Sequence, residues 1–430
     1  MDLRAWAALL IFAATIVLIA KGTLRTATAS LLGASLMVFT GLLSGEEAVA
    51  SIDHNTIGLL VGMMIIVGIL SKSGLFQFMA VKAIKLTKGN AVFIFWIISL
   101  LTAVLSAFLD NVTTVLLVTP VVLSLCDLIS MNPMPLLFAE LFASNIGGAA
   151  TLIGDPPNMI IASVAGFSFN DFIFVTAPVA LIIWAAATAL VCEIYRREIK
   201  SDPEAALRLE KVDESKLIVN RPLMYKSIVV IAAVLLGFVL HGVFKVEAST
   251  VALMAAGVLL AISFVDEGKI LHDEIEWPTI VYFVSLFIMG GGLRATGVID
   301  EMAKLLTGLL AGSPLLMLLG ILWISGITCM FVNNIAYATI FVHVVEAMAT
   351  AASVASPEPF YWALALGACL GGNGTYFGAA ANAVVADFAA KEGSPISFGS
   401  FFKIGAKTVF LSLGIASLAM IWIGWEVITK

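Results

Sequence analysis

Polar residues interrupt the long apolar runs of this chain, and these interruptions constrain its fold more than any other feature. The run 90–130 contains Asp110 and Asn111 near its middle, and the run 135–166 contains a Gly- and Pro-rich segment, 147–158. A carboxylate among apolar residues costs about 2.5–3.5 kcal/mol at a bilayer centre on insertion scales. Such breaks are tolerated where they line a wet cavity inside the protein. We therefore expect them to mark a transport site.

Composition places the chain in a membrane. Hydrophobic residues make up 61% of it and charged residues 12%, whereas soluble domains carry about 25% charged residues. Eight uninterrupted runs approach the roughly 20 residues that span a bilayer: 3–20, 26–43, 56–71, 172–194, 225–242, 247–265, 277–293 and 404–428. No small-residue cleavage site follows the first run, so we expect a retained span and not a signal peptide.

Four further apolar stretches are interrupted. As one helix, 90–130 would be about 60 Å long, twice the hydrocarbon thickness. We therefore predict a re-entrant hairpin that turns at Asp110, and a second hairpin over 313–352. The stretches 135–166 and 360–390 have shorter arms and are expected to be single broken spans.

The two halves of the chain repeat one pattern. G-G-x-x-T-x-x-G-x-x-x-N begins at Gly147 and again at Gly371, and Asp110-Asn111 corresponds to Asn333-Asn334. The predicted fold is an all-α polytopic membrane protein of two repeats, with about ten spans, two re-entrant hairpins and two discontinuous helices. Each repeat crosses the membrane five times, so the second copy is inverted. The predicted units are residues 1–195 and 225–430, joined by a cytoplasmic linker over 196–224.

Positive charge predicts the orientation. With both termini outside the cytoplasmic (inner) membrane, the loops 21–25, 72–89, 195–226, 266–276 and 387–407 become cytoplasmic. These loops hold 18 of the 23 Lys and Arg residues, as the positive-inside rule requires. The segments 74–88 and 297–311 are expected to be amphipathic helices at the membrane interface.

Broken helices expose unpaired backbone groups, which two inverted copies can direct at one cavity. We predict Asp110 and Asp155 as proton- or ion-coupling residues, because burial raises a carboxylate's affinity for protons, as an exchangeable proton site requires. Each has an alternative role as a helix cap or turn residue. The predicted substrate-binding residues carry amide, hydroxyl or backbone groups: Asn111, Thr113, Gly148, Thr151, Asn158, Asn333, Asn334, Asn373, Thr375 and Asn382. Close helix packing is the alternative explanation for the glycines.

Other chemistry is not indicated. The four cysteines lack metal or disulfide spacing, and Cys329 and Cys369 are more typical of small apolar fillers than of metalloid ligands. No phosphate-binding loop is present, so we expect no ATP hydrolysis by that route. We also expect no catalytic residue, no metal or cofactor, and no nucleic-acid partner. Glu140, His343 and Glu346 are expected near the membrane faces. An intramembrane enzyme is disfavoured because the four histidines are far apart in sequence.

The segments DNVTTVLLVTP (110–120), NIGGAATLIGDPPNMI (145–160), FVNNIAYATI (331–340) and GGNGTYFGAAANAVVADFAAKEGSPISF (371–398) give the chain a family resemblance. It resembles the arsenite efflux permeases (ArsB) of the ion transporter superfamily, whose relatives include NhaD-type sodium/proton antiporters, the P protein and divalent-anion/sodium symporters. The resemblance implies hairpin tips and helix breaks that form the site and an elevator-like movement. It also implies a homodimer, and an optional soluble arsenite-stimulated ATPase partner.

Within this group, the two aspartates favour some substrates over others. Carboxylates near a shared cavity repel a dianion unless they are protonated or bound to a cation. We therefore expect proton-coupled export of arsenite or antimonite, with protons exchanging on Asp110 or Asp155. A sodium/proton antiporter and a sodium-coupled anion symporter are the alternatives.

Overall fold

The structure is a computed structural model that describes residues 2–200, 204, 213–244, 246–310, 313–351 and 356–424. Within these residues the regular elements are all helices, and eight of the helices are long and apolar enough to cross a membrane. The helices are α1 (Leu3–Ala20), α2 (Thr26–Phe39), α3 (Gly45–Ala50), α4 (His54–Ser71), α5 (Leu75–Lys85), α6 (Ala91–Phe108), α7 (Asn111–Ile129), α8 (Pro133–Gly148), α9 (Pro156–Ala165), α10 (Phe169–Ile194), the 3-10 helix η1 (Glu214–Leu217), α12 (Arg221–Phe244), α13 (Ala248–Ser263), α14 (Glu267–Asp273), α15 (Trp277–Ala295), α16 (Val298–Leu310), α17 (Pro314–Cys329), α18 (Asn334–Ala351), α19 (Glu358–Gly371), α20 (Ala380–Lys391) and α21 (Phe398–Ile423).

The predicted spans agree with these helices, with three differences in their ends. The span predicted over 404–428 is α21, which begins at Phe398 and ends at Ile423. The span predicted over 26–43 stops at Phe39 because Gly41, with φ +70°, turns the chain. The span predicted over 247–265 stops at Ser263, since Phe264 takes a left-handed conformation with φ 54°. Both helices are therefore shorter than an average bilayer core requires.

All four predicted interruptions are breaks in helical structure. The first hairpin turns at Leu109-Asp110 between α6 and α7, and the second turns between α17 and α18. The two broken spans separate into α8 and α9, and into α19 and α20. Each break leaves backbone groups without an intrahelical partner, so the discontinuous helices predicted from the repeated motif are confirmed.

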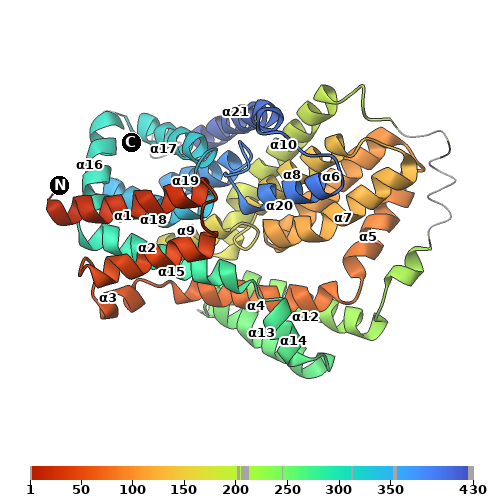
Figure 1. Cartoon of the computed structure of the whole chain (residues 1–430), viewed down its shortest axis with the longest axis horizontal. Coiled ribbons are helices and arrows are strands. Elements are labelled where there is room, and N and C mark those ends of the chain that lie inside the picture. Colours follow the sequence, from red (N-terminus) through yellow and green to blue (C-terminus); the bar gives the residue numbers. More distant parts are fainter. Residues whose placement is uncertain are drawn as a thin grey trace.

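The two copies run in opposite directions. The amphipathic helices α5 and α16, which follow corresponding spans of the two repeats, lie at opposite ends of the molecule (Figure 1). Between the copies the contacts are reciprocal, since α7 packs on α20 and α18 packs on α9. The hairpin of each copy therefore meets the broken span of the other.

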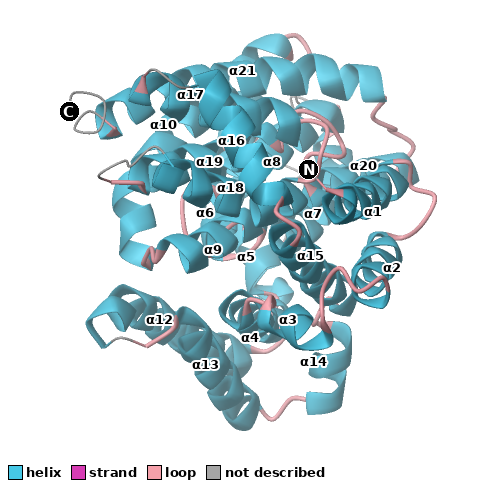
Figure 2. Cartoon of the chain, turned by 90° about the vertical axis from the view of Figure 1, so that its left-hand side faces the viewer, coloured by secondary structure: helices cyan, strands magenta, loops and turns pink. Residues whose placement is uncertain are grey.

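Three helices form a layer apart from this centre. α4, α12 and α13 pack on one another, and they lie together, with α14, in the lower part of the molecule in both views (Figures 1 and 2). α4 also contacts α9, so this layer borders the first broken span.

Several loops that are predicted to be cytoplasmic lie against each other. Lys72 pairs with Glu274 at 2.8 Å, and Lys85 pairs with Glu214. The hydrogen bond from Lys85 lowers the pKa of Glu214. These pairs join the loops 72–89, 195–226 and 266–276 on one face, as a shared side of the membrane requires. Much of the predicted linker and the C-terminal residues 425–430 lie outside the described residues.

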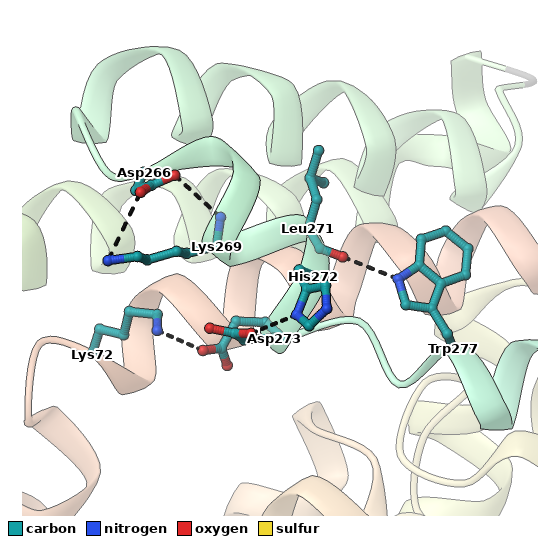
Figure 3. Close-up of polar contacts among 8 residues, drawn as sticks. Lys72, Asp266, Lys269, Leu271, His272, Asp273 and Trp277 are labelled. Carbon is teal, nitrogen blue, oxygen red and sulfur yellow. Dashed lines mark hydrogen bonds and ion pairs between the residues drawn. The ribbon is translucent and has the colours of Figure 1, made fainter.

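The corner between α14 and α15 is fixed by side-chain contacts (Figure 3). The Trp277 indole donates to the Leu271 carbonyl at 3.1 Å, and Pro278 lies in the first turn of α15. Trp277 thereby anchors the start of α15 to α14. Glu276 directly precedes α15 at this corner, so the contact between Trp277 and α14 fixes the position of its backbone.

Candidate transport site

The breaks depend on close backbone approach at glycines of each copy, of which Gly147 and Gly371 are equivalent examples. A Cβ added to Gly147 would lie 2.2 Å from the Ala103 carbonyl oxygen of α6. A Cβ on Gly371 would lie 2.4 Å from the Gly326 carbonyl oxygen of α17. Neither distance is compatible with a side chain, so these glycines allow each hairpin to pack on its broken span, as the packing interpretation predicts.

Threonine side chains of the motif join each helix break to a hairpin. The Thr151 hydroxyl donates to the Ala107 carbonyl, and the Thr375 hydroxyl donates to the Met330 carbonyl. These pairs are equivalent in the two copies. Each joins a break to the tip of the hairpin in the same copy.

The motif asparagines bind the exposed carbonyls of the breaks. Asn158 Nδ2 donates to the carbonyls of Gly148, at 3.2 Å, and Thr151, at 2.8 Å. Asn382 Nδ2 donates to the equivalent carbonyls of the second break, at 2.6 and 2.7 Å. Buried carbonyls that would otherwise lack a partner are thus satisfied.

Asp155 lies at the centre of the molecule, where the copies meet. It is fully buried and accepts hydrogen bonds from Asn334 Nδ2 at 3.2 Å and from Asn111 Nδ2 at 3.4 Å. Asp155 occupies the N-cap position of α9, and its carbonyl accepts from the Asn158 N–H at 2.9 Å, but its side chain makes no capping bond. One carboxyl therefore contacts both hairpin tips.

Asn145 links the same network to the second break. Its Oδ1 accepts from Asn111 at 3.1 Å, and its Nδ2 lies 3.0 Å from Asn373 Oδ1 and 2.9 Å from Asn382 Oδ1. Sequence reasoning did not single out Asn145, although it stands two residues before the repeated motif. Its counterpart in the second copy, Cys369, makes the equivalent contact with Asn158 Oδ1 at 3.4 Å.

Removing Asn145 leaves three buried amides short of a partner. We expect Asn145→Ala to lower the free energy of unfolding by about 1–3 kcal/mol, the range for unsatisfied buried polar groups. Asn170→Ala is the control, because the Asn170 amide bonds to Val239 at an exposed position. Thermal unfolding of the purified protein in detergent measures both variants, and equal melting temperatures would contradict this role for Asn145.

A cavity of about 810 Å³ opens beside Asp155. Five of the predicted site residues line it: Asp110, Asn111, Asp155, Asn333 and Asn334. The other seven lie outside its lining: Thr113, Gly148, Thr151, Asn158, Asn373, Thr375 and Asn382. Several of these seven form the bonds behind the cavity wall described above.

Asp110 caps a helix and also lines the cavity. Its carboxylate accepts from the Thr113 backbone N–H at 2.9 Å and from the Thr113 hydroxyl. Asn333 is equivalent in α18, where its Oδ1 accepts from the Ile335 N–H at 3.0 Å and from the Tyr282 hydroxyl at 3.3 Å. The cap interpretation of Asp110 is confirmed, and the residue still presents a carboxyl to the cavity.

Sequence reasoning missed Glu276, the third acid of the cavity. Its carboxylate accepts from the Thr279 hydroxyl at 3.0 Å, and it lines the same cavity as Asp110. Nothing in the sequence relates Glu276 to Asp110, because the two line the same cavity only through the corner between α14 and α15. Arg25 contributes the single positive charge among the residues that line this cavity.

The two cysteines that were considered as metalloid ligands do not line the cavity. Cys329 and Cys369 are buried and are absent from the wall. Among the described residues no group of His, Cys, Asp and Glu side chains could hold a metal ion. The cavity is lined by carboxyl, amide, hydroxyl, guanidinium, aromatic and aliphatic groups.

Sequence comparison identifies relatives over the whole chain. It is 38% identical to a 46 kDa membrane protein of Mycobacterium leprae, over 98% of this chain and 99% of that protein. It is 39% identical to an uncharacterized transporter of Mycobacterium tuberculosis, with the same coverage. The P protein of Mus musculus is 29% identical over 91% of this chain and 57% of its own length, in agreement with the resemblance noted above.

Solved structures share the fold at low sequence identity. The Alcanivorax borkumensis YdaH transporter, described as having an unusual topology, matches with a TM-score of 0.58 and 16% identity over 99% of this chain and 98% of its own. Neisseria gonorrhoeae MtrF, described with a class of antimetabolite efflux pumps, matches with a TM-score of 0.61 and 14% identity over 98% and 95%. These likenesses identify the architecture of a membrane transporter.

A family model settles the classification. The model described as citrate transporter (CitMHS) matches residues 9–367, which include both hairpins and the first broken span. The arsenite permeases are therefore not singled out within the superfamily. This chain belongs to the CitMHS family of membrane transporters.

Proposed function

We propose that this protein is a proton-coupled secondary transporter of a neutral or cationic solute across the cytoplasmic membrane, with arsenite and antimonite as the first candidates. The observation that supports this most is the charge of the cavity. Three carboxyls, Asp110, Asp155 and Glu276, line it with one arginine. Such a surface attracts cations, admits neutral molecules such as As(OH)3, and repels anions.

Asp155 is the coupling residue in this proposal. Its carboxyl is buried between amides of both copies, where the charged form is disfavoured relative to water. A proton on Asp155 neutralises the centre, and its release to one side allows the solute to bind or leave. Asp110 is the second coupling residue, at the tip of the first hairpin.

The cavity fits an inward-open state. Residues from the loops predicted to be cytoplasmic, Arg25 and Glu276, line it together with the hairpin tips. Transport then requires α6–α9 and α17–α20 to move against the rest of the molecule, in the elevator-like manner that the resemblance implies. The same resemblance extends the proposal to a homodimer and to a soluble ATPase partner.

Citrate is the second candidate, because the family model carries that description. A citrate trianion meets three carboxyls and one guanidinium in the cavity, so its approach is opposed unless a cation accompanies it. A sodium/proton antiporter of the same fold remains an alternative for the same electrostatic reason.

Transport by purified protein in liposomes under an imposed pH gradient tests these assignments. Arsenite, antimonite, sodium, and citrate with and without a divalent cation are offered separately. We expect arsenite flux in the direction opposite to protons, and proton flux that arsenite stimulates. Proton flux that responds only to sodium would replace the proposal with an antiporter, and flux that responds only to citrate would replace it with a symporter.

A further inference from the structure

A second buried acid lies outside the cavity. Glu140 is in the middle of α8 and fully buried, although the sequence places it near a membrane face. Its Oε1 accepts a hydrogen bond from the Thr119 hydroxyl of α7 at 2.6 Å. Its Oε2 is buried and has no hydrogen-bond partner in the described part of the chain.

Two more buried hydroxyls, one on α7 and one on α8, are also unsatisfied. The hydroxyls of Thr114 and Ser144 have no hydrogen-bond partner among the described residues. Ser144 is one turn beyond Glu140 in α8 and next to Asn145, while Thr114 is about one turn from Asn111 in α7. Buried polar groups of this kind bind ordered water.

These groups lead from Glu140 towards Asp155. Glu140 and Asn145 are separated by about 7.5 Å along the helix axis. At the far end, Asn111 joins Asn145 at 3.1 Å and Asp155 at 3.4 Å. None of Glu140, Thr119, Thr114 and Ser144 lines the cavity, so these polar groups of α7 and α8 are separate from it.

The second copy shows that the fold does not need polar groups at these places. The positions equivalent to Thr119, Glu140 and Ser144 are Val342, Leu364 and Ala368, and all three are fully buried. An apolar pair packs there in the second copy without a hydrogen bond. The buried acid of the first copy therefore calls for a role other than packing.

We propose that Glu140 is a further proton-carrying carboxyl, which exchanges protons with Asp155 along the α7–α8 interface while the solute uses the cavity. This inference rests on the proton coupling proposed above. In the step, the O–H bond of the Glu140 carboxyl breaks and an O–H bond forms on water held by Thr114 and Ser144. Water then delivers one proton to the Asp155 carboxylate, and Glu140 keeps one negative charge until it is reprotonated.

Reprotonation starts from the end of α7. Cys126 and Asp127 lie in the last turn of α7, and Asp127 is exposed near the loop that joins α7 to α8. Other titratable groups at this end of α8 are Tyr195, whose ring stacks on Phe138, and Glu198, which accepts a hydrogen bond from Asn132 at 2.7 Å. The path thus begins at a loop on the side that positive charge assigns to the cytoplasm.

Two variants and two assays in liposomes test the role of Glu140, with arsenite as the probe. Glu140→Gln keeps the size and the Thr119 contact but carries no exchangeable proton. The double variant Thr119→Val with Glu140→Leu copies the second repeat, so it is expected to fold. Ser325→Ala is the control, because it removes a buried hydrogen bond to Tyr337 in the second copy.

Proton-driven arsenite flux is compared with arsenite exchange at equal pH, which moves no net proton. We expect both Glu140 variants to lose about 100-fold in proton-driven flux, the low end for a positioned proton-transfer group, and to keep exchange within about twofold. Wild-type proton-driven flux in Glu140→Gln, or equal loss in both assays, would overturn the role of Glu140. Absence of proton movement with the wild-type protein would instead refute the proposed function, and this inference with it.

Discussion

Asp155→Asn is expected to reduce proton-driven transport to the level of protein-free liposomes. The amide keeps the size of the side chain and can still accept from Asn111 or Asn334, so the central network keeps much of its geometry. It binds no exchangeable proton. Intramembrane ionisable residues that contact both halves of a transporter are typical of proton relays.

Asp300→Asn provides the matched control. Asp300 is exposed on α16, so the substitution makes the same change of charge away from the cavity. Its flux is expected to equal that of the wild type. If the Asp155→Asn protein retained proton-driven flux, Asp155 would not be the coupling residue. If it still bound arsenite but showed no flux, the defect would lie in proton coupling and not in solute binding.

Gly147→Val is expected to give the largest loss of stability among single substitutions at the breaks. Its Cβ would meet the Ala103 carbonyl oxygen at 2.2 Å and the Ala103 Cα at 2.7 Å. Both atoms belong to the backbone of α6, which cannot move aside without opening the first hairpin. Overpacking costs about 1–3 kcal/mol in most cores and more where the backbone must shift.

Gly257→Val separates this effect from a general cost of replacing glycine in a helix. Gly257 lies in α13 with no atom within 4 Å of an added Cβ, so its variant should melt like the wild type. The measurement is the melting temperature of the purified protein and the fraction that elutes as a monodisperse species. A Gly147→Val protein as stable as Gly257→Val would show that α6 and α8 do not need their close approach.

Much of the fold could be read from periodicity and interruption. Asp110 predicts the corner between α6 and α7 because a carboxylate cannot continue an apolar span at low cost. The glycines and prolines over 147–158 predict a break because they disfavour a continuous helix. Helix ends were less certain, as α2 shows, since a single residue such as Gly41 stops a helix within an apolar run.

The site was only partly readable. The motif residues Thr151 and Asn158 attracted attention as substrate ligands, yet their side chains bond to backbone carbonyls. A repeated polar residue looks the same in the sequence whether its side chain binds a solute or bonds to backbone carbonyls at a helix break. Glu276 and Asn145 lie outside the repeated motif. Their contacts come from distant segments of the chain, so no local sequence pattern marks them as site residues.

The sequence by itself determined that this protein is a membrane protein with two inverted copies of one broken-helix pattern, since hydropathy and spacing are local properties of the chain. Only the tertiary structure decided which polar groups share a cavity, which lie behind it, and that Glu140 is buried between α7 and α8. Those relations depend on contacts between residues separated by tens to hundreds of positions. Hydrogen bonds and charges act over a few ångströms, so their partners are set by packing and not by order in the chain.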